Sequence, residues 1–110
     1  MVAPPRRSTF IKIDFEPQAG HEQMGFRPAL VVSHTAFNRK LGFAFVCPLS
    51  TTNRRNRFYV PIPYGLGING VVMCDQMRSL DYVARNAQFL CECPDELFAE
   101  VLGRIKPILF

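Results

Sequence analysis

The segment from Pro48 to Tyr59 brings hydroxyl, guanidinium and aromatic side chains together in close succession. Three hydroxyl residues leave the end of an apolar run, three arginines follow, and two aromatic residues close the segment. Hydroxyls and guanidinium groups bind phosphate oxygens, and aromatic rings stack on unpaired bases. The pattern favours a loop for single-stranded nucleic acid, with a hairpin tip of solvated arginines as the alternative. The side chains concerned are those of Ser50, Thr51, Thr52, Arg54, Arg55, Arg57, Phe58 and Tyr59.

A second polar segment, Gly20 to Pro28, lies between two predicted strands. It places an imidazole, a carboxylate and a guanidinium within eight residues, on His21, Glu22 and Arg27. A loop held by a rigid scaffold is where binding and catalytic groups are commonly found. The alternative is a solvated connection in which Glu22 and Arg27 form a surface ion pair that contributes little.

The remaining candidates are a polar pair and four thiols. Asp75 and Gln76 separate two apolar segments, and an aspartate at the end of a strand more often bonds turn amides than a ligand. Cys91 and Cys93 resemble a metal or redox fragment, but zinc needs about four ligands and the sequence holds no second close cysteine pair. We therefore expect structural thiols, no metal and no cofactor. All four cysteines lie in apolar stretches without the spacing of a disulfide scaffold, which favours a reduced, intracellular protein.

The alternation of apolar and polar residues predicts the elements that must position these groups. Thr9 to Phe15 alternates as a half-buried strand, and the apolar runs Ala29–Val32 and Phe43–Cys47 predict buried central strands. Between those two runs, Thr35 to Leu41 can hold one short helical turn. Short strands with frequent turn signals predict a mainly β (α+β) fold built on a small, strongly curved barrel. Further strands are expected at Phe58–Ile62, Val71–Cys74, Gln76–Leu80 and Gln88–Cys93.

The C-terminal segment changes to a helical period. Pro94 fits the first helical position, and Leu97, Val101 and Ile105 recur at helical spacing. These residues predict an amphipathic helix that covers one face or the mouth of the barrel. Pro107 should kink or stop this helix and leave residues 108–110 as an apolar tail suited to a partner surface.

Chain length and charge distribution indicate the number of domains and the kind of partner. A chain of 110 residues is long enough for one domain, 1–110, of which residues 1–8 are expected to be flexible. The first 60 residues hold nine basic and three acidic residues, a net +6, whereas the last 50 carry a net −2. An anionic partner should therefore bind mostly against the first half. The N-terminus lacks an apolar signal core, and no uncharged run reaches the roughly 20 residues of a membrane span, so the cytoplasm is the expected compartment.

Several short motifs follow one another along most of the chain: Asp14-Phe15-Glu16-Pro17, Gly20-His21-Glu22-Gln23, Gly25 to Ser33, Ala36-Phe37-Asn38, Pro48 to Thr51, Gly70-Val71-Val72, Asp75-Gln76, Ser79-Leu80-Asp81 and Glu100 to Arg104. In that order they strongly resemble the MazF/PemK(Kid)/ChpB family of type II toxin-antitoxin endoribonuclease toxins. The resemblance implies a small SH3-like β-barrel with a C-terminal helix, and a homodimer. It also implies sequence-specific, metal- and ribosome-independent cleavage of single-stranded RNA, and neutralisation by a cognate antitoxin with an acidic tail.

The resemblance assigns roles to individual residues. In the family's mechanism the ribose 2′-oxygen attacks the adjacent phosphorus, which requires a base, positive charge on the phosphorane oxygens and a proton for the leaving 5′-oxygen. Arg27 matches the family's arginine and would stabilise the phosphorane, while Ser50, at the usual threonine position, would hydrogen-bond the scissile phosphate. Glu22 matches the glutamate proposed as base, and His21 and Asp75 match residues used for catalysis or RNA positioning. Contacts to RNA are further expected from Thr51, Arg54, Arg57 and Gln76.

One departure from the family and two other functions bear on this interpretation. The PemK branch carries an arginine where this chain has Met73, so Arg27 must supply the positive charge. A CcdB-like toxin with the same barrel would instead inhibit DNA gyrase by protein binding, a function that does not need Glu22, Arg27 or Ser50. A third possibility is a degenerate family member that acts only as a dimeric partner for other proteins.

Overall fold

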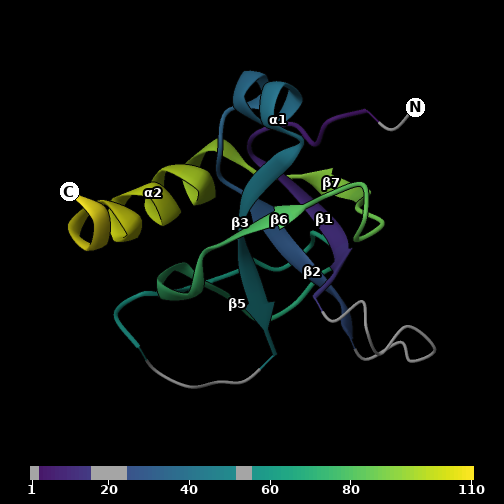
Figure 1. The fold of residues 1–110 in the computed structure, drawn as a ribbon. Helices are drawn as coiled ribbons and strands as arrows, with labels where there is room; N and C mark the ends of the chain where they lie inside the picture. Colours follow the sequence, from purple (N-terminus) through teal and green to yellow (C-terminus); the bar gives the residue numbers. More distant parts are fainter. Residues whose placement is uncertain (1–2, 16–24, 52–55) are drawn as a thin grey trace.

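The computed structural model of the chain describes residues 3–15, 25–51 and 56–110 (Figure 1). These residues form short antiparallel strands, two α-helices and one turn of 3-10 helix, η3. In chain order the elements are β1 (Thr9–Asp14), β2 (Phe26–Val31), α1 (Thr35–Leu41), β3 (Phe43–Ser50), β4 (Tyr59–Pro61), β5 (Val71–Met73), η3 (Cys74–Gln76), β6 (Arg78–Asp81), β7 (Gln88–Glu92) and α2 (Asp95–Leu109).

The sheet is built on β3. One edge of β3 pairs with β2, and the other edge is shared by β6, along residues 43–46, and β5, along residues 49–50. Beyond β2 the sheet continues with β1 and then β7, while β4 pairs with β5. Within the described residues no ladder joins β6 to β7, so the sheet is curled but not closed. The mainly β fold with a short helix and a C-terminal helix is confirmed, as an open sheet where the sequence predicts a barrel.

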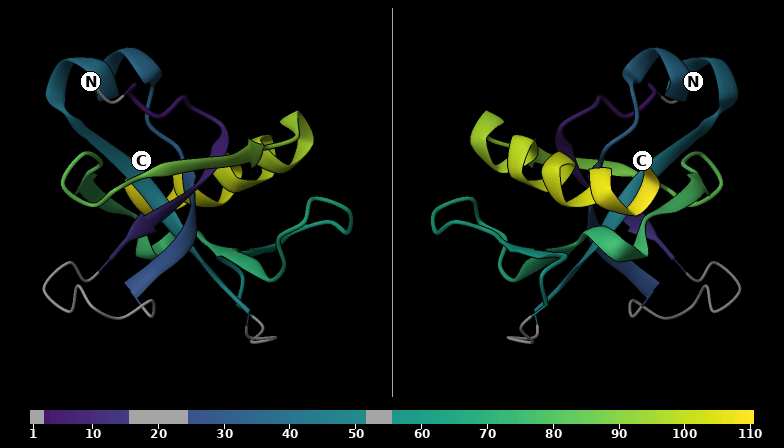
Figure 2. Two further views of the ribbon diagram at one scale, coloured as in Figure 1. Left: turned by 90° about the vertical axis from the view of Figure 1, so that its right-hand side faces the viewer. Right: turned by 90° about the vertical axis from the view of Figure 1, so that its left-hand side faces the viewer.

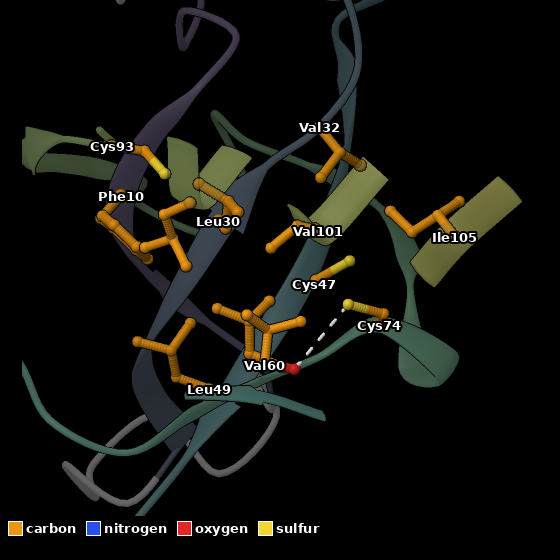
Figure 3. Close-up of a cluster of buried hydrophobic side chains, with 12 residues drawn as sticks. Phe10, Leu30, Val32, Cys47, Leu49, Val60, Cys74, Cys93, Val101 and Ile105 are labelled. Carbon is orange, nitrogen blue, oxygen red and sulfur yellow. Dashed lines mark hydrogen bonds between the residues drawn. The ribbon is translucent and has the colours of Figure 1, made fainter. Parts of the chain in front are cut away.

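Alternation along the strands produces two apolar cores on opposite faces of the sheet. The helix α2 crosses one face and packs Val101 and Ile105 against the first core, toward Val32 and Cys47 (Figures 2 and 3). The neighbouring strand positions point to the other face and build the second core. Its members are Ile11, Ile13, Ala29, Val31, Ala44, Val46, Leu80 and Tyr82, with Phe15 and Ala87 packed against them.

Two strands are longer than the sequence predicts. β2 begins at Phe26 and β3 runs on to Ser50, so each strand contains a proline, Pro28 and Pro48. A proline lacks the N–H that a ladder uses and is uncommon inside strands. The strands predicted from the sequence therefore stop short of these positions. Pairing with the neighbouring strand nevertheless continues past Pro28, because Arg27 lies opposite Ile13 on β1. Arg27 and Ser50 are therefore strand residues, and the expectation that they lie in loops is wrong.

The C-terminal helix also runs further than expected. Pro94 is the N-cap residue and α2 extends from Asp95 to Leu109, so the predicted stop at Pro107 is wrong. Pro107 lies in the last turn, where it removes only the hydrogen bond that its N–H would donate to the carbonyl of Gly103. The turn closes behind it, since the N–H of Phe110 donates to the carbonyl of Lys106 at 2.8 Å. None of the helices in the described residues is long and apolar enough to cross a membrane.

A fully buried amide, that of Asn38 on α1, ties three parts of the fold together. Its Nδ2 donates to the carbonyl of Pro5 at 2.9 Å, and its Oδ1 accepts from the Ser33 hydroxyl at 2.5 Å. Its main-chain carbonyl accepts the Tyr82 hydroxyl at 2.9 Å and the N–H of Gly42 at 3.0 Å. Asn38 therefore fixes the N-terminal segment and the turn after β6 to α1.

Asn38→Ala should lower the free energy of unfolding by about 2–3 kcal/mol, because it leaves the Pro5 carbonyl without the Asn38 donor and the Ser33 hydroxyl without the acceptor of its proton. Urea denaturation measures this loss. Asn38→Asp keeps the shape but cannot donate to Pro5, so it should also destabilise, whereas the exposed neighbour Arg39→Ala should lie within about 0.5 kcal/mol of the parent. An Asn38→Ala protein as stable as Arg39→Ala would contradict this role.

Candidate active site

Arg27 and Ser50 come together at one end of the sheet. The last pair of the ladder between β2 and β3 joins Ala29 to Pro48, and continuing that register by two residues places Arg27 opposite Ser50. Both positions have the parity of the second core, as Ala29 and Val46 do, so both side chains share one face of the sheet. Arg27 is exposed and Ser50 is half-buried. By this extrapolated register, a permanent cation and a hydroxyl, two groups that bind phosphate oxygens, share one face at the same end of the sheet.

The main chain at Ser50 is held by a close approach of Gly70. Gly70 has φ +111°, and a Cβ built on it would lie 2.0 Å from the carbonyl oxygen of Ser50. The carbonyl of Gly70 accepts the N–H of Ile62 at 2.9 Å, which fixes the far end of the loop between β4 and β5. Only glycine fits this position, both for its backbone angle and for its distance from β3. The motif Gly70-Val71-Val72 therefore sets the place of Ser50.

Two further residues extend the same face, and the sequence does not identify either as a site residue. Phe15 follows β1 and packs against the second core. The guanidinium carbon of Arg78, on β6, lies 5.3 Å from the centre of the Phe15 ring. Alternation with the core residue Leu80 could have predicted the face of Arg78, but its contact with Phe15 depends on the curl of the sheet.

Asp75 and Gln76 lie apart from this pair. They belong to η3, which separates β5 from β6 along the edge of β3. The Asp75 carboxylate is exposed, and the Gln76 amide donates to the Tyr59 hydroxyl at 3.3 Å. Burial is the main cause of the raised pKa of Cys47, followed by Cys74 and then the charge of Asp75. Among the described residues no ion pair joins Asp75 to Arg27.

The other expected RNA contacts are divided between the two sides of the molecule. Thr51 is exposed directly after β3, next to Ser50. Arg57 lies against α2 instead, where its carbonyl accepts a hydrogen bond from Arg104 Nη1. A cavity of about 430 Å³ is lined there by Arg57, Phe58, Arg104 and Pro107. The structure therefore brings Thr51, but not Arg57, to the end of the sheet that carries Arg27.

His21, Glu22 and Arg54 lie outside the described residues. The flanks of the segment 16–24 are placed, since the N–H of Phe15 donates to the carbonyl of Gly25 at 2.7 Å. Both flanking residues are next to β1 and β2 at the end that carries Arg27.

The four cysteines are free thiols, as expected, and three of them are buried. Burial raises the pKa of Cys74 to about 11 and that of Cys93 to about 11, and it also raises the pKa of Cys47. A raised pKa keeps a thiol protonated and unreactive at neutral pH. The structural role predicted for Cys91 and Cys93 is supported by their packing against the first core.

These thiols make stability depend on alkaline pH. In the folded chain their pKa lies above the ordinary value of 9.0, so their contribution is complete below pH 9 and is lost as the pH rises toward 11. Urea midpoints should therefore fall between pH 8 and pH 10.5. A Cys74→Ala, Cys93→Ala variant should show a flatter decline, which separates the thiols from lysine and tyrosine titration. Parallel declines in the two proteins would contradict the assignment.

The fold and these residues define an antiparallel β protein that carries Arg27, Ser50 and Arg78 on one face of its curled sheet, groups of the kind that bind phosphate oxygens. Residues 6–109 match the family model described as PemK-like, MazF-like toxin of type II toxin-antitoxin system. The chain belongs to this toxin family, so the family identified from the sequence motifs is confirmed.

Relatives and a solved structure extend the match over nearly the whole chain. Endoribonuclease PemK of Escherichia coli is 41% identical over 102 residues, which cover 88% of this chain and 76% of PemK. Endoribonuclease toxin ChpB of Escherichia coli K12 is 37% identical over 108 residues, covering 94% and 92%. A chain in the crystal structure of MazE-MazF from Deinococcus radiodurans superposes with a TM-score of 0.84 at 35% identity, covering 96% of this chain and 95% of that one.

Proposed function

We propose that this toxin is a sequence-specific endoribonuclease, an mRNA interferase that cleaves single-stranded RNA without a metal ion and without the ribosome. The observation that carries the proposal is that Arg27 and Ser50 are on the same face, at the ends of the neighbouring strands β2 and β3. It is supported by the names of PemK and ChpB, which are endoribonucleases. The reaction is attack of the ribose 2′-oxygen on the adjacent phosphorus, with departure of the 5′-oxygen. The products are a 2′,3′-cyclic phosphate and a 5′-hydroxyl end.

Arg27 supplies the positive charge that the reaction needs. Its guanidinium stays charged at any physiological pH and presents several N–H donors, so it can stabilise the phosphorane oxygens as negative charge develops. Met73, where the PemK branch has an arginine, is buried on β5 opposite Tyr59 and offers no charge. Ser50 donates its hydroxyl to a non-bridging oxygen of the scissile phosphate.

The base is assigned by the match to the family, and water is the proposed source of the proton that the departing 5′-oxygen takes up. Glu22 is the proposed base for the 2′-hydroxyl, with His21 and Asp75 as the other candidates. Asp75 lies on η3, which separates β5 from β6. The RNA chain would be positioned by His21, Thr51, Arg54, Arg57, Asp75 and Gln76.

The partners proposed for the chain are a second copy of itself and an acidic antitoxin. An apolar cavity of about 260 Å³ lies between the end of α2 and the strands, lined by Phe45, Leu102 and Leu109 among others. The last residues of the chain, Ile108 and Phe110, are 42% and 95% exposed, and such apolar side chains suit a partner surface. The solved MazE-MazF relative supports an antitoxin partner. The cytoplasm, where mRNA is translated, is the proposed compartment.

The direct test is incubation of the purified protein, in EDTA, with a long single-stranded RNA, followed by mapping of the cleaved ends. We expect cuts at one short sequence, with 2′,3′-cyclic phosphate and 5′-hydroxyl termini. Intact RNA across varied sequences, together with trapped DNA gyrase cleavage complexes, would instead establish the CcdB-like function. Loss of cleavage on addition of EDTA would overturn metal independence alone.

A further inference from the structure

The pair formed by Arg78 and Phe15 lies beside the proposed site but has no part in its chemistry. Arg78 projects from β6, and its guanidinium carbon is 5.3 Å from the centre of the Phe15 ring. The Arg78 side chain is exposed, and among the described residues no carboxylate pairs with it. A cation–π contact of this kind orders a guanidinium while leaving its N–H groups open to solvent.

Strand register links this pair to the catalytic arginine. Arg27 lies directly opposite Ile13 on β1, and Phe15 is two residues further along the chain. Both side chains belong to the face of the second core, so Phe15 and Arg27 are diagonal neighbours, a separation of about 7–8 Å. Ser50, Arg27 and Phe15 therefore lie toward the end of the sheet, while Arg78 is set back on β6, opposite Val46 of β3, and its side chain extends to the Phe15 ring.

The backbone that carries Phe15 is fixed on both sides. Arg85 Nη1 donates to the Phe15 carbonyl at 2.9 Å and to the Asp14 carbonyl at 3.2 Å. On the other side the N–H of Phe15 donates to the carbonyl of Gly25 at 2.7 Å. The ring thus offers Arg78 a rigid support.

Two other arginines on aromatic rings have their donors engaged, and a third, Arg57, whose guanidinium carbon is 5.9 Å from the Phe58 ring centre, lies against α2 instead. Arg6 lies 5.6 Å from the Phe89 ring centre but is ion-paired with Glu92, and Arg7 lies 5.1 Å from the Phe98 ring centre but donates to the carbonyl of Val32. These arginines contribute to the fold. Arg78 differs from both because its N–H groups have no protein acceptor among the described residues.

We propose that Arg78 forms a second phosphate-binding subsite, for a backbone phosphate of the RNA next to the scissile one, and that Phe15 is the residue that positions it. The inference rests on the proposed function, because it concerns the same nucleic acid. A single strand that places its scissile phosphate between Arg27 and Ser50 can run across Phe15 and meet the donors of Arg78. Such a contact strengthens binding with little effect on the chemical step, and it weakens with salt.

The test compares Arg78→Ala with Arg39→Ala, an exposed arginine on α1 with no ring contact and remote from the site. Binding is measured against salt concentration with a single-stranded DNA of the cleaved sequence, which lacks the 2′-hydroxyl and cannot react. Arg78→Ala should weaken binding about 3–10-fold near 0.1 M salt and reduce the slope of log K against log salt by about 0.7. On RNA it should raise KM by the same factor, with kcat within about twofold of the parent.

Variants of Phe15 test the positioning role. Phe15→Leu keeps an apolar group against the second core but removes the ring, so KM should rise without a large change in kcat, and adding Arg78→Ala should raise it little further. Phe15→Trp keeps the ring and should retain affinity. Because the chain has no tryptophan, the new indole is a single fluorophore whose emission should change when the DNA binds.

The outcomes separate this inference from the proposed function. If the parent protein cleaves RNA and Arg78→Ala matches Arg39→Ala in affinity and salt slope, the subsite is wrong and the nuclease assignment survives. A fall in kcat at unchanged KM would also overturn it, since that result makes Arg78 part of the chemistry. If the parent protein neither binds the DNA nor cleaves RNA, the proposed function itself fails.

Discussion

Arg27→Ala should abolish RNA cleavage, lowering kcat/KM by about 10³-fold or more while leaving the fold intact. Among the described residues, Arg27 is the permanent cation that the extended register sets opposite Ser50, and in the proposed mechanism its charge stabilises the phosphorane oxygens. Its removal should cost little stability, because the side chain is exposed at the end of β2. Initial rates on an RNA of the mapped cleavage sequence measure the loss, and urea denaturation measures stability.

Arg27→Lys is the matched variant for this prediction. Lysine keeps the charge but loses the planar fork of donors, so its rate should lie between those of the parent and Arg27→Ala. A similar rate for Arg27→Lys and the parent would show that charge alone is needed. Cleavage by Arg27→Ala at the parent rate would remove Arg27 from the mechanism.

The strands and helices could be predicted from the sequence because their signals are local. Alternation from Thr9 to Phe15 and the helical spacing of Leu97, Val101 and Ile105 identify elements that the structure contains. The errors concern their ends. Pro28 and Pro48 hide the continuation of two strands, and Pro107 marks a helix end that comes two residues later.

The candidate site was less accessible from the residues themselves. Chemistry by residue type selects the segments that contain Arg27 and Ser50, but only the family resemblance brings the two together. Their proximity depends on the register of two ladders, which no single segment encodes. The contact of Phe15 with Arg78 joins residues 63 positions apart and depends on the curl of the sheet. Arg57, predicted to contact RNA because it belongs to the segment Pro48 to Tyr59, lies instead against α2.

The position of Ser50 should prove as sensitive to Gly70 as to its own identity. In Gly70→Ala the added methyl group would lie 2.0 Å from the Ser50 carbonyl oxygen. The residue would also have to keep a φ of +111°, which an L residue rarely adopts. Since the close atom belongs to the backbone, β3 and the loop before β5 must move apart. We expect the free energy of unfolding to fall by about 3–5 kcal/mol, near the upper end for one substitution. Urea denaturation with Gly103→Ala as control measures it, because Gly103 is helical with open space at its Cβ and should be neutral or slightly stabilised.

Moving this backbone should affect RNA cleavage but not the salt dependence of DNA binding. At a temperature where Gly70→Ala is still folded, cleavage should fall about 10-fold or more, because the Ser50 hydroxyl is displaced from the phosphate that Arg27 binds. The Arg78 subsite depends on β1 and β6, away from Gly70, so the salt dependence of DNA binding should keep its slope. Parent-like stability and rate in Gly70→Ala would mean that the close approach to Ser50 does not hold the site in place.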